Sequence, residues 1–177
     1  MAADLRKKVE EDRGMLKKIE LAIPGFRGYR KREDLRIADS LLRAQLADRL
    51  KNVGAQVEQC RQDLVKGMEL DLLEDAARLV NNIQKTENRV RHAEQGYSGI
   101  SRDFRIEEKE LNRLYEWDLR LLEDIDKIRG EVTSLQSAIT AQNKAELPTR
   151  LRSAVSTIQE FNTVFDKRIE VIGGIGV

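Results

Sequence analysis

Residues 111–139 read LNRLYEWDLRLLEDIDKIRGEVTSLQSAI, and this stretch decides the fold. Along it, apolar residues and one aspartate recur at alternating intervals of three and four, without a slip. The positions are Leu111, Leu114, Asp118, Leu121, Ile125, Ile128, Val132, Leu135 and Ile139. Side chains at this spacing return to one face of a helix that packs in coiled-coil fashion. The stretch therefore predicts a long helix over 103–141 with its seam buried.

Similar seams elsewhere predict four further helices. Their expected ranges are 3–23, 32–66, 69–95 and 148–172. Pro24 ends the first because proline cannot continue a helix, and Pro148 suits the first turn of the last. The third seam is expected to begin at Met68, and the last to bury Phe165, Ile169 and Ile172.

The composition supports a single helical domain over residues 1–177. Charged residues make up 36% of the chain and hydrophobic residues 40%, which suits long amphipathic helices with narrow apolar stripes. Short connections between the helices favour an elongated, antiparallel up-and-down bundle of about five helices, all-α in class. We expect the apolar, glycine-rich residues 173–177 to form a flexible tail.

The charge balance and the cysteine content limit the binding partners and the compartment that we expect. The 32 Lys and Arg residues nearly cancel the 31 Asp and Glu residues, so nucleic acid or anionic lipid would be bound only locally. Cys60, the only cysteine, falls at an expected core position and is predicted to be a buried, inert thiol in a reducing compartment. No apolar run approaches the roughly 18 residues of a membrane span, so we expect a soluble, cytoplasmic protein.

The direction of the chain depends on Gly67. It follows Lys66, a basic last-turn residue, and a glycine there can adopt the left-handed conformation that caps a helix. We therefore predict a tight αα-hairpin. The alternative is one uninterrupted helix through Gly67, at a cost of about 1 kcal/mol relative to alanine.

Two loops share one pattern: residues 25–29 read GFRGY and residues 96–100 read GYSGI. If the chain reverses at Gly67, both loops lie at the same end of the bundle. The candidate binding residues there are Phe26, Arg27, Tyr29, Arg30, Lys31, Arg32, Tyr97, Arg102 and Arg105. Aromatic faces among guanidinium groups suit phosphate, an acidic peptide or a lipid headgroup. In the blander alternative, Phe26 and Tyr29 cap the core and the basic residues are solvated.

Asp118 occupies a core position of the deciding stretch. A buried carboxylate needs a partner, so we expect a hydrogen bond to a Tyr or Arg of a neighbouring helix, or a role in fixing helix register. His92 is expected in the last turn of the third helix, where it complements the helix terminus. Phosphate-binding glycine loops, paired cysteines and HExxH spacing are missing from the sequence, so we expect no catalytic residues, no metal and no cofactor.

The chain also resembles a family of prokaryotic all-helical coiled-coil or bundle proteins. Three stretches carry the resemblance: residues 23–43 (IPGFRGYRKREDLRIADSLLR), residues 96–99 (GYSG) and residues 114–122 (LYEWDLRLL). Such proteins have similar glycine-tyrosine loops in the same order, although Phe26 and Trp117 depart from the tyrosine-like pattern. The resemblance implies a helical fold and a prokaryotic origin. No activity, cofactor or site comes with it.

These observations rank the functions. A non-catalytic scaffold or adaptor that binds other proteins, including further copies of itself, comes first. The alternative is a peripheral membrane-associated or membrane-stress protein that binds anionic surfaces through the basic-aromatic loop 25–32. A nucleic-acid-binding or ribosome-binding protein that uses the same loop is the further alternative.

Overall fold

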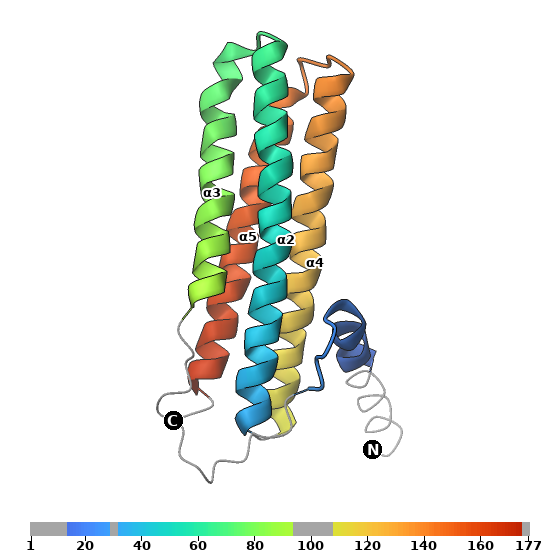
Figure 1. Ribbon diagram of the computed structural model, residues 1–177, viewed down its shortest axis with the longest axis vertical. Helices are drawn as coiled ribbons and strands as arrows, with labels where there is room; N and C mark the ends of the chain where they lie inside the picture. The colour runs from blue at the N-terminus through green and yellow to red at the C-terminus, as the bar shows by residue number, and fades with distance from the viewer. Residues whose placement is uncertain (1–13, 29–31, 94–107, 175–177) are drawn as a thin grey trace. The chain divides into compact units, whose positions relative to one another are not determined.

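The computed structural model describes residues 14–28, 32–93 and 108–174, and within these ranges the chain is all-α, without strands (Figure 1). A helix covers residues 14–22. The longer helices are α2 (Arg32–Lys66), α3 (Leu73–His92), α4 (Glu108–Thr140) and α5 (Leu147–Gly174), with the short 3₁₀ helix η1 (Leu70–Leu72) before α3. The predicted helical class is confirmed. Among the described residues, no helix combines the length and hydrophobicity that a membrane span requires.

The predicted and observed helix bounds agree most closely for α2, which covers the predicted range of 32–66. Helix α3 begins four residues later than predicted because η1 comes first. The predicted start of a flexible tail at Gly173 was wrong, since α5 continues to Gly174. A glycine weakens a helix by only about 1 kcal/mol, so the packed turn that holds Ile172 can extend into the two glycines. Residues 3–13, 94–95 and 103–107 of the predicted helices lie outside the described residues.

The chain divides into two compact units. Unit 1 comprises Met1–Gln45, Ala93–Leu122 and Val164–Val177, and unit 2 comprises Leu46–His92 and Glu123–Thr163. Helices α2, α4 and α5 each contribute residues to both units.

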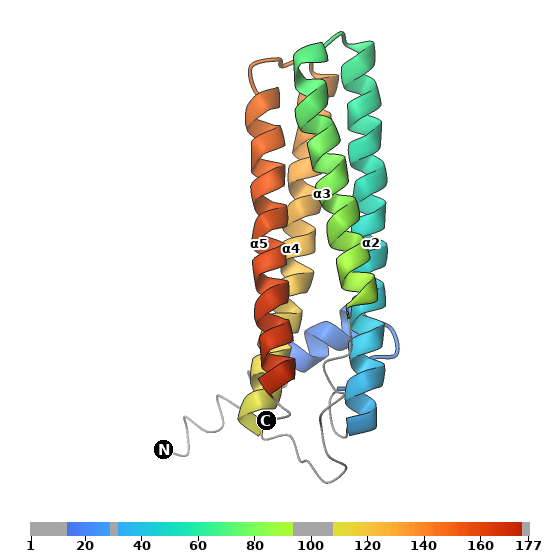
Figure 2. The same ribbon diagram turned by 90° about the vertical axis from the view of Figure 1, so that its left-hand side faces the viewer.

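In unit 2, α2 turns into α3 and α4 turns into α5, and consecutive helices run antiparallel (Figure 2). The predicted seams form its core. Its fully or almost fully buried residues include Leu50, Val53, Val57, Cys60, Leu64, Ala76, Leu79, Ile83, Val90, Ile125, Ile128, Val132 and Leu135. Helices α2 and α3 approach closely at Gly54, where a Cβ atom would lie 3.2 Å from Cγ2 of Ile83.

The chain reverses after Gly67, so the predicted hairpin is confirmed, but the cap differs from the prediction. The left-handed residue is Met68, with φ of 60°. The Glu69 amide donates to the Leu64 carbonyl at 3.0 Å and the Met68 amide to the Val65 carbonyl at 3.1 Å. This pair of bonds defines a Schellman motif, which satisfies carbonyl groups at the end of α2. Met68 is 74% exposed, so the prediction that it begins the third buried seam was wrong.

Helix α4 ends in the same way. Gln142 has φ of 54°, the Asn143 amide donates to the Ala138 carbonyl at 3.0 Å, and the Gln142 amide donates to the Ile139 carbonyl at 3.0 Å. Both hairpin turns of unit 2 therefore place a residue other than glycine in the left-handed position, where a Cβ atom is strained.

Unit 1 is characterised by the side chains that it buries. Its buried apolar residues include Ile19, Ile23, Phe26, Ala38, Leu42, Leu114, Tyr115, Leu121, Val164, Phe165 and Ile172. Gly28 packs against Tyr115: it has φ of +81°, and a Cβ atom on it would lie 2.7 Å from the Tyr115 hydroxyl oxygen. Only glycine suits both the left-handed backbone and this close approach.

Candidate functional site

A chain of buried ion pairs crosses the core of unit 1. Arg168 of α5 donates from Nε to Oδ1 of Asp118 on α4 at 2.5 Å, and from Nη1 to Oδ1 of Asp39 on α2 at 2.6 Å. Arg43, one turn after Asp39, donates from Nε to Oδ2 of Asp39 at 2.8 Å. Arg168 is 1% exposed and Asp118 is fully buried. The charges of two carboxylates and two guanidinium groups thus neutralise one another in the buried core.

The second arginine also binds the backbone. Nη1 of Arg43 donates to the carbonyl oxygen of Ala93, directly after α3, at 2.9 Å. A satisfied set of buried charges contributes little net stability, but the loss of one member leaves another charge unpaired, so such a set restricts which packings of the helices are possible. The geometry therefore suits the holding of α2, α4 and α5 in register within unit 1.

Sequence reasoning singled out Asp118 but missed Asp39, Arg43 and Arg168. It also expected Ile169 in the core, and this was wrong because Ile169 is 37% exposed while Arg168 is buried. A signal was present: positions 158, 161, 165, 168 and 172 alternate by three and four, as in the deciding stretch. The prediction chose Ile169 for the core because isoleucine is more hydrophobic than arginine. Arg168 occupies the core position instead, because the buried carboxylate of Asp118 requires a cation.

The described part of the predicted loop site forms a groove in unit 1. The loop and α2 together line this open groove, which has a volume of about 350 Å³. Its lining residues are Gly25, Arg27, Gly28, Ile37, Ala38 and Leu41. Arg27 is exposed and Ile37 is 57% exposed, so an apolar groove opens beside a guanidinium group.

The other candidate loop residues divide into two groups. Phe26 is 4% exposed, so it does not offer an aromatic face to a partner. It packs in the core, in agreement with the alternative that its ring caps the core. The remaining candidates, or their side chains, lie outside the described residues: Tyr29, Arg30, Lys31, Arg32, Tyr97, Arg102 and Arg105. The chain reverses after Gly67, as the expectation of a shared end required, but residues 96–100 lie outside the described residues.

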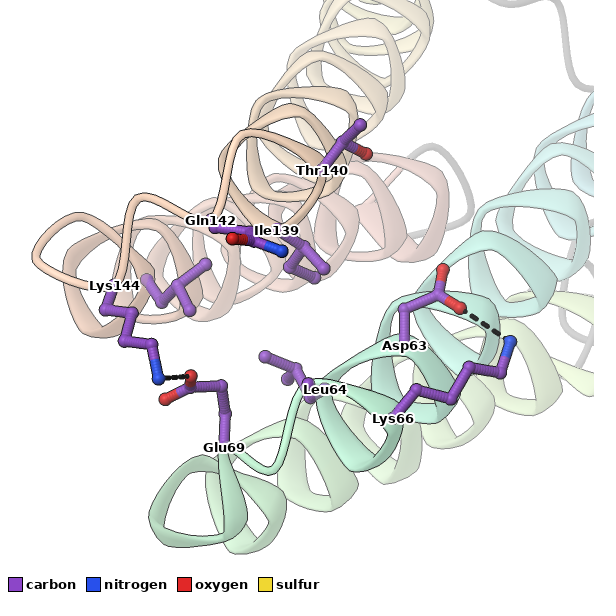
Figure 3. A pocket seen from close by; sticks show the side chains of 10 residues that line it. Asp63, Leu64, Lys66, Glu69, Ile139, Thr140, Gln142 and Lys144 are labelled. Carbon is purple, nitrogen blue, oxygen red and sulfur yellow. Dashed lines mark hydrogen bonds and ion pairs between the residues drawn. The ribbon is translucent and has the colours of Figure 1, made fainter.

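A second groove lies in unit 2, between the two hairpin turns, and has a volume of about 390 Å³ (Figure 3). The side chains that line it come from the end of α2 and from the α4–α5 turn. Lys144 of one turn pairs with Glu69 of the other, and Lys66 donates from Nζ to Oδ1 of Asp63 at 3.0 Å (Figure 3). The hydrogen bond from Lys66 is the largest cause that lowers the pKa of Asp63, with a further bond from Gln136. Sequence reasoning did not foresee this groove, because it is made of two turns that are distant in sequence.

Two other buried ionisable groups line neither groove. Burial raises the pKa of the Cys60 thiol to about 11, and the Asp63 carboxylate adds to the rise. Sγ of Cys60 donates to Oε1 of Gln136 at 3.1 Å. Asp124 is 2% exposed and accepts a bond from Lys127 Nζ at 2.7 Å on one oxygen, while its Oδ2 has no hydrogen-bond partner. In the part of the chain that the structure describes, no three His, Cys, Asp or Glu side chains gather as a metal site would require.

Comparisons with family models, with curated proteins and with solved structures find no match to this chain. The resemblance to prokaryotic helical proteins therefore stays a prediction.

Proposed function

We propose that the protein is a non-catalytic helical adaptor that binds another protein through the groove between loop 25–28 and α2. The observation that carries the proposal is the open apolar groove, about 350 Å³ in volume, with the exposed Ile37 on its wall. A single exposed isoleucine is common on protein surfaces, but here it borders an apolar groove, which is the shape and composition that can take up a partner's side chain. The groove is large enough to accept one or two apolar side chains of a protein partner.

The charges beside the groove indicate the character of that partner. Arg27 lines the groove, and Arg36 is exposed on α2 next to Ile37 in sequence. A guanidinium group binds carboxylates with two parallel hydrogen bonds and so adds direction to an apolar contact. An apolar anchor flanked by acidic residues would therefore suit this surface best.

A second candidate function is attachment to an anionic membrane surface. Leu21 is 78% exposed on the helix 14–22, and Lys17 and Lys18 are exposed on the same helix. Apolar and basic side chains on one short helix favour the headgroup region of anionic lipid. Glu20 on the same helix opposes this attraction, which places the membrane second.

The test compares Ile37→Glu and Arg27→Glu with Ala44→Glu, which adds the same charge as the first at another exposed position of α2 in unit 1. Each protein, shown to be folded by circular dichroism, is used to purify partners from native lysate with nuclease and detergent controls. A protein that is lost with the first two variants and kept with the third supports the proposal. Retention by all three contradicts it. A partner that disappears with detergent, together with flotation on anionic vesicles, selects the membrane; one that disappears with nuclease selects nucleic acid.

A further inference from the structure

The loop that lines the groove of unit 1 has backbone amides without acceptors. Gly28 is buried, yet neither its amide nor the amide of Arg27 donates a hydrogen bond to any residue that the structure describes. The amide of Phe26, one residue earlier, donates to the Ile23 carbonyl at 3.2 Å. A covered amide without an acceptor costs free energy, and native proteins usually satisfy such a group. Arg27 and Gly28 both line the groove, so a ligand bound there can supply the missing acceptor.

The lining of this groove carries one charge, and it is positive. Arg27 is the only ionisable residue among the lining residues, and its exposed guanidinium group forms no ion pair with the described part of the chain. A guanidinium group and backbone amides are all hydrogen-bond donors. A ligand group that only accepts hydrogen bonds, as a carboxylate does, matches this end of the groove.

The packing of the loop holds these donors in place. A Cβ atom on Gly28 would lie 2.7 Å from the Tyr115 hydroxyl oxygen and 3.4 Å from Cδ1 of Leu16, and Phe26 is 4% exposed. Gly28 has φ of +81°, and successive amides beside a left-handed residue can converge on an anion. Donors that are fixed before the ligand arrives lose little entropy on binding.

The opposite wall offers apolar surface that a ligand can still cover. Ile37 is 57% exposed and Leu41 is half-buried, whereas Ala38 between them is buried. In the last residue of a protein, the side chain and the carboxylate are attached to the same Cα atom, so one small groove can hold both. An internal acidic residue instead places its carboxylate and the apolar side chain on different residues, and its chain has to continue past the donors.

We infer that this groove binds the C-terminal residue of a partner protein. The apolar side chain of that residue lies against Ile37 and Leu41, and its carboxylate accepts hydrogen bonds from the guanidinium group of Arg27 and from the amides of Arg27 and Gly28. Capture of a C-terminal carboxylate by backbone amides is a recurring mode of peptide recognition. The inference rests on the proposed function, because it names the part of the partner that the same groove takes.

The test uses the full chain and three fluorescein-labelled peptides with the same Gly-Ser spacer. The first ends in leucine with a free carboxylate, the second is the same peptide with a C-terminal amide, and the third has an internal Glu-Leu pair and an amidated end. Fluorescence anisotropy at physiological salt measures binding to the wild type and to variants that circular dichroism shows to be folded. Arg27→Gln is compared with Arg113→Gln, at an exposed arginine of α4 in unit 1. Ile37→Ser is compared with Leu21→Ser, at a residue of unit 1 that is 78% exposed.

The first peptide should bind about tenfold more tightly than the second, because the amide removes the charge of the acceptor. Arg27→Gln should weaken its binding about tenfold through the lost charge-assisted bonds, and Ile37→Ser about fivefold through the lost apolar contact. Both control variants should stay within about twofold of the wild type. In ¹⁵N–¹H correlation spectra, the Gly28 amide should shift with the first peptide and not with the second.

Three results would overturn the inference. Equal binding of the first two peptides would show that the terminal carboxylate is not recognised. Tighter binding of the third peptide than of the first would show that the groove takes an internal segment, and the proposed function would stand without the C-terminus. If none of the three peptides binds, the inference fails, and the lysate experiment with Ile37→Glu decides the proposed function separately.

Discussion

Arg168 lies between two carboxylates in the core of unit 1, with contacts of 2.5 Å to Asp118 and 2.6 Å to Asp39. Its replacement removes the cation that Asp118 and Asp39 share, while Arg43 remains on Asp39. We expect Arg168→Met to lower the free energy of unfolding by about 3–5 kcal/mol, as measured by urea denaturation.

Two controls separate the ion pairs from packing. Lys167→Met changes a neighbouring residue that is 53% exposed and should alter stability by less than about 0.5 kcal/mol. The combined replacement of Asp39, Arg43, Asp118 and Arg168 by Leu or Met should restore stability close to that of the wild type, because no buried charge remains. A single Arg168→Met variant as stable as the wild type would contradict the buried network.

Met68 and Gln142 provide a prediction of the opposite sign. Each is in the left-handed conformation at the end of a helix, with φ of 60° and 54°. Glycine adopts this conformation without strain, so Met68→Gly and Gln142→Gly should each raise the free energy of unfolding by about 0.5–1 kcal/mol. Val65→Gly, inside α2, should lower it by a similar amount, and thermal denaturation of the three variants measures the difference. If Met68→Gly is destabilising, the cap has been misassigned.

Cys60 predicts a dependence of stability on pH. Burial raises the pKa of its thiol from 9.0 to about 11, so the folded state favours the neutral form. This contribution is present in full below pH 9.0 and is lost as the pH rises toward about 11. The stability difference between the wild type and Cys60→Ala, from denaturation at a series of pH values, should be constant below pH 9.0 and should then shift in favour of the variant. A difference that stays constant up to pH 11 would contradict the burial of the thiol.

Single residues also show where the sequence was informative. Strict spacing placed Asp118 in the core, and the structure has it fully buried. The same spacing applied to α5 would have selected Arg168 instead of Ile169. Gly67 was expected to be the left-handed cap, but Met68 takes that position one residue later, because glycine preference is a statistical signal while the hydrogen bonds of the turn decide the register.

Among the helices, the glycines inside α4 and α2 provide a test of how closely each helix is packed. Gly130 lies in the middle of the helix, and a Cβ atom on it would meet no side chain or other segment within 4 Å. Gly130→Ala should therefore raise the free energy of unfolding by about 0.5–1 kcal/mol through helix propensity, as measured by urea denaturation. Gly54→Ala should gain less, because its Cβ would lie 3.2 Å from Ile83 and force α2 away from α3. Equal gains at both positions would argue against the close approach of these helices.

The helices themselves were largely predictable because amphipathic periodicity is a local property. The bounds of α2 follow from the seam from Ala38 to Leu64 and the basic end at Lys66. The start of α3 was less predictable from the sequence. The preceding η1 depends on a hydrogen bond from the Leu72 amide to the Glu69 carbonyl at 3.2 Å, and no periodic pattern encodes this bond.

For the molecule as a whole, two grooves among the described residues differ in their chemistry. One has Arg27 beside an apolar wall, and the other is lined by two acids, Asp63 and Glu69, and two lysines, Lys66 and Lys144. Sequence reasoning found part of the first through the pattern of its glycine loop and found nothing of the second. The reason is physical: a loop motif is contiguous, whereas the second groove exists only because two turns more than 70 residues apart lie together.

An adaptor must contact its partner at the groove of unit 1, and this can be measured directly. A photoreactive benzoylphenylalanine is placed at position 37 in one protein and at position 44 in another, both exposed on α2. After irradiation in native lysate, the adducts are identified by mass spectrometry. If the groove binds a partner, a specific protein adduct should form at position 37, should be missing at position 44 and should be reduced by Arg27→Glu. Adducts that are identical at the two positions, or consist only of lipid or nucleic acid at position 37, would contradict it.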